Sequence, residues 1–175
     1  SLTKKLKECV NLKNGATVIL HPVKNPSSYG IASINNKNKI TKIIEKPKKT
    51  HSNLAVTGLY FFDNKVINFS KKIKPSKRNE LEIVDLLNKY KKNKKLKAEF
   101  LGRGGAWLDT GSIKDFYDTS AFVYALENRQ GLKIACLEEI SLINKWIKKK
   151  DIESAIKFYG KCNYSQYLST LSSIS

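Results

Sequence analysis

The chain of 175 residues contains no methionine, and it begins at Ser1. We therefore expect that it is not an unprocessed translation product and that a segment preceded it. No apolar run approaches the roughly 18–20 residues that a membrane-spanning helix requires. The start also lacks the basic and then apolar segment of a signal peptide. These absences predict a cytoplasmic protein with no membrane partner.

Arginine is scarce, since only Arg78, Arg103 and Arg129 contribute to the 33 Lys and Arg residues. The lysine excess gives a formal net charge of +18, which raises the possibility of nucleic-acid binding. However, the lysine clusters lack the repeated interleaving of aromatic residues that stacks on single-stranded bases. We interpret them as solvated helix ends, where cations suit the helix dipole, and expect no nucleic-acid partner.

Cysteine and histidine are also few. Cys9, Cys136 and Cys162 are widely separated and form no CxxC pair, so the sequence predicts neither a zinc site nor a disulfide framework. His21 and His51 stand alone, without the neighbouring groups that nucleophilic catalysis needs, so we expect neither to be catalytic.

The hydrophobic content of 41% is sufficient for a buried core, and the length fits one domain. The run 53–63 is apolar on both alternating faces, which predicts a central strand covered on both sides. Periodicity predicts an α/β fold with a helical C-terminal part. The expected strands are 16–23, 29–35, 40–47, 53–63 and 97–102, and the expected helices are 79–92, 112–131 and most of the last forty residues.

A single carboxylate, Asp109, directly follows Trp107 and Leu108 in the segment GRGGAWLDTGSIKDF. An acid in apolar company needs a cation or a hydrogen-bond donor, because an unpaired buried charge is costly. Asp109 either caps the helix that begins near Ser112 or holds a metal ion. A hard carboxylate oxygen would favour Mg²⁺.

Charged residues also stand at a strand end and before a helix. Glu45 and Lys46 precede Pro47, which ends the strand ladder. A carboxylate suits sugar hydroxyls and an ammonium suits a phosphate, although the spacing alone favours a surface charge pair. Arg78 precedes a helix start, a position that favours phosphate binding.

Two glycines and a tyrosine lie in the expected strands 29–35 and 53–63. Gly30 and Gly58 either let the backbone approach a ligand closely or mark bulges. The ring of Tyr29 packs either against a sugar ring or in the protein interior.

Taken in order, five segments closely resemble the glucose-1-phosphate thymidylyltransferases across essentially the whole chain. They are GATVILHPVKNPSSYGIASI, IIEKPKKTHSNLAVTGLYFFD, KRNELEIVDLLNKY, FLGRGGAWLDTGS and ENRQGLKIACLEEIS. The resemblance implies a nucleotidyltransferase-like, Rossmann-type mixed sheet. It also implies synthesis of dTDP-glucose and pyrophosphate from dTTP and α-D-glucose 1-phosphate with Mg²⁺, by in-line attack without a covalent protein intermediate.

The resemblance also implies that this chain lacks part of the family's active site. The family's glycine-rich nucleotide loop, its triphosphate-binding residues and a second metal aspartate belong before Ser1, so the sheet is expected to be incomplete and the chain inactive alone. We expect a sugar-phosphate-binding part at 1–130 and a C-terminal helical segment at 131–175 with oligomer and regulatory contacts, in a full-length homotetramer. The alternative is a naturally truncated sugar-phosphate-binding or regulatory remnant.

Site roles follow from the resemblance, position by position. Lys46 and Asp109 are expected to be catalytic, with Asp109 on the metal. The expected substrate-binding residues are Tyr29, Gly30, Glu45, Lys46, Val56, Arg78 and Trp107. Arg103, Glu138 and Glu139 are expected to be regulatory. The chain departs from the family pattern at Ile44, Asn79 and Gly105, and we expect Gly105 to loosen the loop that carries Asp109.

Overall fold

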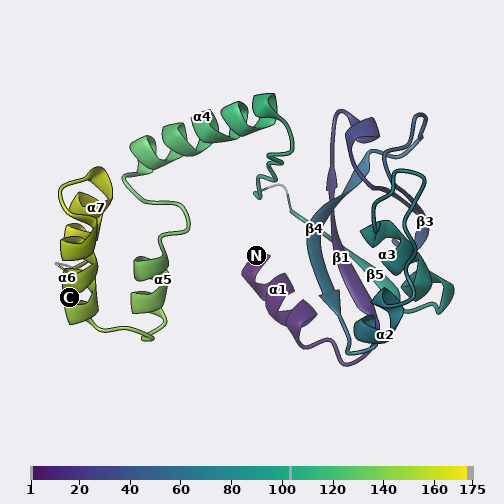
Figure 1. Ribbon diagram of the computed structural model, residues 1–175, viewed down its shortest axis with the longest axis horizontal. Helices are drawn as coiled ribbons and strands as arrows, with labels where there is room; N and C mark the ends of the chain where they lie inside the picture. Colours follow the sequence, from purple (N-terminus) through teal and green to yellow (C-terminus); the bar gives the residue numbers. More distant parts are fainter. Residues whose placement is uncertain (1, 103, 173–175) are drawn as a thin grey trace. The chain divides into compact units, whose positions relative to one another are not determined.

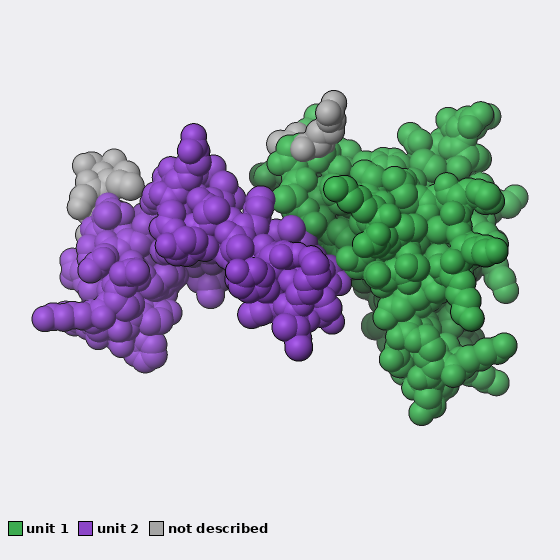
Figure 2. Space-filling model, turned by 90° about the horizontal axis from the view of Figure 1, so that it is seen from above, with its two compact units in different colours: residues 1–107 green, residues 108–175 purple. Residues whose placement is uncertain are grey.

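The computed structural model describes residues 2–102 and 104–172. They belong to two compact units, residues 1–107 and 108–175, coloured separately in Figure 2. The division between the units falls before the long helix α4 (Ile113–Gln130), whereas the sequence places a domain boundary at the end of that helix.

Unit 1 is built on a five-stranded mixed sheet in the order β3-β2-β4-β1-β5 (Figure 1). Only β5 runs parallel to its neighbour β1, and the other pairs are antiparallel. The elements of unit 1 are α1 (Leu2–Val10), β1 (Ala16–Pro22), a 3-10 turn η1 (Pro26–Ser28), β2 (Ile31–Ile34), β3 (Ile40–Ile44), β4 (Leu54–Phe62), α2 (Val66–Ser70), α3 (Ile83–Lys92) and β5 (Leu96–Phe100). The predicted α/β class and the hairpin of β2 with β3 are confirmed.

The central position of β4 is confirmed, but its predicted cover on both sides is only half right. Ala55, Val56 and Thr57 are buried, whereas Leu59 keeps 41% of its surface exposed. The apolar pattern therefore located the strand correctly but overstated its burial, because exposed apolar side chains are common on protein surfaces.

Helix α3 covers the sheet with a buried stripe of Val84, Leu86, Leu87 and Tyr90. The i, i+3, i+4, i+7 spacing predicts most of this stripe. The hydroxyl of Tyr90 donates a hydrogen bond of 2.7 Å to Asp63, which follows β4. This contact fixes the C-terminal half of α3 beside the end of β4.

Helix α1 is absent from the sequence-based expectations. Its nine residues, LTKKLKECV, include only four apolar positions, so the pattern is too short to be distinctive. Cys9 is nevertheless buried, and Lys5 lies 3.4 Å from Glu99 of β5. Tertiary contacts rather than local propensity therefore stabilise this helix.

Unit 2 contains α4 and three further helices, α5 (Leu137–Ile143), α6 (Lys149–Tyr159) and α7 (Asn163–Ser172). Its core consists of Cys136, Ile152, Leu168 and Leu171, so the predicted helical C-terminal part is confirmed. Helix α4 contributes no buried residue to that core. None of the helices in the described part of the chain combines the length and hydropathy needed to cross a bilayer.

Candidate functional site

Gly30 and Glu45 lie at the same end of the β2–β3 hairpin, just beyond the paired residues Ile31 and Ile44. The backbone N–H of Val56 donates to the carbonyl oxygen of Gly30 at 2.8 Å, which ties β4 to this corner. A Cβ atom on Gly30 would lie 3.0 Å from Oε2 of Glu45, tighter than most real Cβ contacts. The structure therefore brings three of the predicted substrate-binding residues, Gly30, Glu45 and Val56, to one corner of the sheet.

Glu45 faces the guanidinium of Arg78, with Oε1 3.7 Å from Nη1. Both residues line a cavity of about 350 Å³, together with Ser76, Lys77, Glu82, Val84, Asp85, Asn88 and the two isoleucines at the end of β3. A carboxylate and a guanidinium in one cavity supply both an acceptor for hydroxyls and a donor fork for phosphate.

Burial raises the pKa of the Glu45 carboxyl, and the negative charge of Glu82 raises it further. The nearby charges of Lys46 and Arg78 oppose this rise. Only 23% of the Glu45 side chain is exposed, so desolvation is the dominant cause. This carboxylate is therefore in an environment that favours a hydrogen-bond donor or a cation as its neighbour.

Glu82 is a member of the site that the sequence did not predict. Its Oε1 lies 3.3 Å from Nη1 of Arg78 and accepts a 2.9 Å hydrogen bond from the hydroxyl of Ser76. Arg78 also lies 2.7 Å from Glu80 at the surface. Both residues precede the first turn of α3, so no helical periodicity in the sequence reveals this pair.

Lys46 joins the site through its backbone. Its N–H donates to the carbonyl oxygen of Tyr29 at 3.0 Å, and its φ of 41° lies in the left-handed region that favours glycine. Such strain persists where the surrounding structure over-determines it, often at functional sites. Its side chain is exposed, and within residues 2–102 and 104–172 no ion pair joins it to Glu45. The predicted surface charge pair is thus not formed.

Tyr29 and Trp107 form an aromatic wall in unit 1. Their rings meet edge to face with centroids 5.1 Å apart, and the indole N–H of Trp107 donates to the carbonyl oxygen of Thr57 at 3.0 Å. The ring of His21 lies 6.2 Å from Trp107, and its Nδ1 is buried without a hydrogen-bond partner. Neither Thr57 nor His21 was predicted to belong here, and an isolated histidine gives no sequence signal.

Asp109 lies in unit 2 and does not cap α4. Ser112 is the N-cap, and its side chain accepts a 3.1 Å hydrogen bond from the backbone N–H of Asp115. The capping alternative for Asp109 is therefore wrong. Its carboxylate is exposed and forms no ion pair in the described part of the chain, so it is free to act as one metal ligand.

The remaining ligands of a metal at Asp109 would have to come from elsewhere. Among the described residues, no group of three or more His, Cys, Asp or Glu side chains is arranged to hold a metal ion. Mg²⁺ often uses only one or two carboxylates and completes its shell with water and substrate phosphates. The donor chemistry of Asp109 fits Mg²⁺ on those terms.

Gly105 lies in the same segment as Asp109 but is held by local contacts. Its N–H donates to the carbonyl oxygen of Gly102 at 2.9 Å. A Cβ at Gly105 would lie 2.8 Å from Cγ of Leu101, so the glycine allows the chain to pass close to that side chain. This close approach accounts for a glycine here more directly than the looser loop that the sequence led us to expect.

The two glutamates expected to be regulatory hold unit 2 together. Glu138 accepts hydrogen bonds from the hydroxyls of Tyr164 and Tyr159, the latter at 3.1 Å, and Glu139 accepts one of 2.6 Å from Tyr167. Burial acts to raise the pKa of Glu138, but the hydrogen bonds, that of Tyr164 above all, lower it on balance. Arg103, the third of these residues, lies outside the described residues.

Comparison with known proteins identifies relatives that cover nearly the whole chain. The glucose-1-phosphate thymidylyltransferase of Neisseria meningitidis serogroup A is 43% identical over 168 residues, which are 96% of this chain and 58% of that protein. The enzyme of the same name from Neisseria gonorrhoeae is 44% identical over the same shares. The chain thus spans less than two thirds of the curated relatives that it matches.

Solved structures agree with the fold. A Bacillus anthracis protein assigned as a glucose-1-phosphate thymidylyltransferase and solved with a sucrose is 40% identical, with a TM-score of 0.61 over 69% of this chain and 48% of that one. A UDP-glucose pyrophosphorylase complexed with UDP-glucose is 26% identical, with a TM-score of 0.57 over 71% of this chain and 47% of that one. The model of the nucleotidyl transferase family matches residues 1–125. The chain belongs to the nucleotidyl transferase family.

Proposed function

We propose that this chain is the sugar-binding part of a glucose-1-phosphate thymidylyltransferase, which makes dTDP-glucose and pyrophosphate from dTTP and glucose 1-phosphate. The observation that carries the proposal is the corner where Gly30 leaves a gap beside the half-buried carboxylate of Glu45, with Arg78 3.7 Å from that carboxylate. The names of the relatives support the choice of sugar and nucleotide.

Each residue then has a distinct task on the sugar side. Glu45 accepts hydrogen bonds from sugar hydroxyls, and the buried corner strengthens them because water is excluded. The backbone of Gly30 and Val56 approaches the ring, and Tyr29 with Trp107 supplies an apolar wall beside it.

The phosphate group is assigned to Arg78 and Lys46. Arg78 is already paired with carboxylates, but its contact with Glu80 lies at the surface, and such pairs contribute only about 0–1 kcal/mol. A phosphate can therefore replace Glu80 on the guanidinium at small cost. The exposed ammonium of Lys46 can bind the same phosphate.

Asp109 is assigned to the metal. Bound Mg²⁺ would neutralise phosphate charge during the transfer, while Asp109 supplies one carboxylate ligand. We further propose that the full-length enzyme is a homotetramer and is located in the cytoplasm, where nucleoside triphosphates are available. Arg103, Glu138 and Glu139 are proposed to make regulatory contacts.

A chimera tests this function. The N-terminal segment of the Neisseria meningitidis relative, up to the point where the similarity begins, is joined to this chain and assayed for pyrophosphate release from dTTP and glucose 1-phosphate. We expect turnover by the chimera, its loss on Glu45→Gln, and none by the chain alone. A folded chimera without turnover, together with glucose 1-phosphate binding by the chain, would instead favour the truncated binding remnant.

A further inference from the structure

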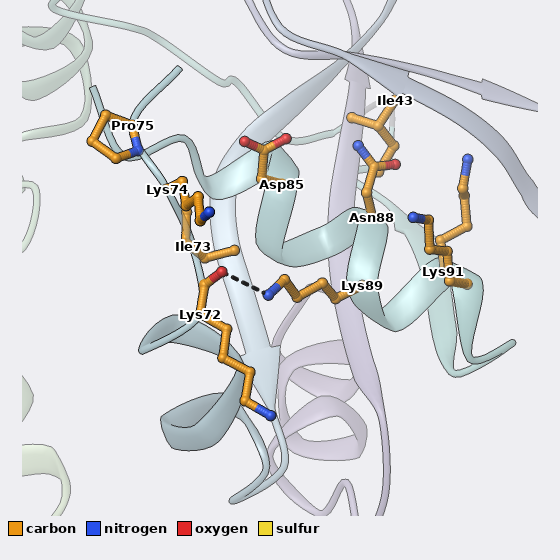
Figure 3. A pocket seen from close by; sticks show the side chains of 10 residues that line it. Ile43, Lys72, Ile73, Lys74, Pro75, Asp85, Asn88, Lys89 and Lys91 are labelled. Atoms are coloured by element: carbon orange, nitrogen blue, oxygen red, sulfur yellow. Dashed lines mark hydrogen bonds between the residues drawn. The ribbon is translucent and has the colours of Figure 1, made fainter. Parts of the chain in front are cut away.

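A second cavity of unit 1, the basic cavity, has a volume of about 690 Å³. Figure 3 shows its lining side chains, which come from β3, from the segment after α2 and from one face of α3. The lining residues are Ile43, Lys72, Ile73, Lys74, Pro75, Asp85, Asn88, Lys89, Lys91 and Lys92. Its volume falls within the range of about 300–1,000 Å³ that small-molecule sites occupy.

The charge of this lining is one-sided. Five of the ten residues are lysines, and Asp85 is the one carboxylate among them. In the part of the chain that the structure describes, none of the five lysines forms an ion pair with a carboxylate. The positive charge of the cavity is therefore left without a partner from the protein, and it attracts anions.

Two of the ammonium groups are held in place by the main chain. Nζ of Lys89 donates to the carbonyl oxygen of Lys72 at 3.0 Å, the dashed contact in Figure 3. Nζ of Lys91 donates to the carbonyl oxygen of Thr41 at 3.0 Å. Both side chains are only half exposed. An ammonium has three donors, so each keeps two for a ligand after binding its carbonyl.

The same helix face also offers hydrogen-bonding groups of other kinds. Asp85, Asn88, Lys89 and Lys92 share one side of α3, because residues three and four apart are neighbours on a helix. The side-chain amide of Asn88 forms no hydrogen bond within the described residues. A carboxylate and an amide can accept hydrogen bonds from hydroxyl groups while the lysines hold an anion.

Lysines at the end of a helix are often no more than solvated charges that complement its dipole. Here, however, Lys72 and Lys74 come from a separate segment and meet the helix lysines around one hollow. We propose that the basic cavity binds a small phosphorylated compound with hydroxyl groups, whose phosphate is held by the lysines that line the cavity and whose hydroxyls donate to Asp85 and Asn88.

The basic cavity adjoins the candidate sugar site but is distinct from it. Ile43, Asp85 and Asn88 border both cavities, whereas Glu45 and Arg78 line only the sugar site. A ligand in the basic cavity therefore leaves the Glu45–Arg78 pair untouched, and the two sites can be separated by substitution.

The test is an NMR titration of the ¹⁵N-labelled chain with glycerol 3-phosphate, which carries one phosphate and two hydroxyls. The chain is compared with the double variant Lys89→Gln/Lys91→Gln, in which the side chains stay polar but the charge is gone. The control is Lys7→Gln/Lys13→Gln, which removes the same charge from exposed lysines elsewhere in unit 1.

We expect saturable shifts of the amides of 72–74 and 88–92, with affinity at least tenfold weaker in the first variant and unchanged in the control. Equal weakening in both variants, or shifts spread over the surface, would mean only a solvated lysine surface and would overturn the proposal. Shifts centred on Glu45 and Arg78 would also overturn it, because the probe would then occupy the sugar site.

Discussion

The Cβ atom that Gly30 lacks would lie 3.0 Å from Oε2 of Glu45 and 3.2 Å from Cγ2 of Val84. The glycine therefore keeps a narrow space open in front of a half-buried carboxylate. The sugar-binding role proposed for this corner depends on that space.

Gly30→Ala tests the space directly. The added methyl group must push aside Glu45 or Val84, and such overpacking costs about 1–3 kcal/mol of stability. We expect that loss in urea unfolding and at least a tenfold loss of glucose 1-phosphate affinity in calorimetry. Gly104→Ala is the matched control, because a Cβ there meets nothing within 4 Å, and it should change neither quantity.

Glu45→Gln is expected to stabilise the chain at neutral pH while weakening sugar binding. The pKa of Glu45 is raised in the folded chain, so its stabilising contribution is present below its ordinary pKa and is lost as the pH rises through the raised value. Glutamine removes this loss. Urea unfolding at pH 4 and pH 7 should show the variant gaining on the parent chain only at pH 7, and an equal difference at both pH values would contradict the assignment.

Substitutions at Ser112 and at Asp109 distinguish the residue that caps α4 from the residue proposed to bind the metal. Ser112→Ala removes the N-cap of α4 and should lower the stability of unit 2 by about 0.5–2 kcal/mol. Asp109→Ala should leave stability unchanged but abolish Mg²⁺-dependent turnover of the chimera. Thermal unfolding and pyrophosphate release measure the two effects, and loss of stability in the Asp109 variant would restore the capping interpretation.

Tyr164→Phe is expected to lower the stability of unit 2. Its hydroxyl donates to the Glu138 carboxylate and lies 3.2 Å from Sγ of Cys136, so removing it leaves a half-buried carboxylate short of a donor. The cost should be about 1–3 kcal/mol, seen as faster amide hydrogen exchange in α5 and α7. Tyr124→Phe, on a side chain with 72% exposure, serves as the control and should leave exchange unaltered. Unchanged exchange in the Tyr164 variant would rule out a structural role for this contact.

The sequence predicted most of the fold because its elements carry strong periodic patterns. Strand β4 and the buried stripe of α3 follow directly from apolar spacing. Helix α1 escaped prediction because nine lysine-rich residues carry little periodic information and depend on contacts such as Lys5 with Glu99.

The site was predictable only in part. Gly30 and Glu45 stand in recognisable segments, so resemblance identified them. Glu82 was missed because its role depends on a side-chain contact with Arg78 rather than on a motif. His21 was missed because its position beside Trp107 arises from residues 86 positions apart in the chain coming together in the folded sheet.

The most direct test of the account is a calorimetric titration of the chain with glucose 1-phosphate, repeated on Glu45→Gln and on Lys7→Gln/Lys13→Gln. We expect saturable one-to-one binding that weakens at least tenfold in the Glu45 variant and is unaffected in the lysine control. Absence of binding by the folded chain, or equal affinity with and without the Glu45 carboxylate, would contradict it.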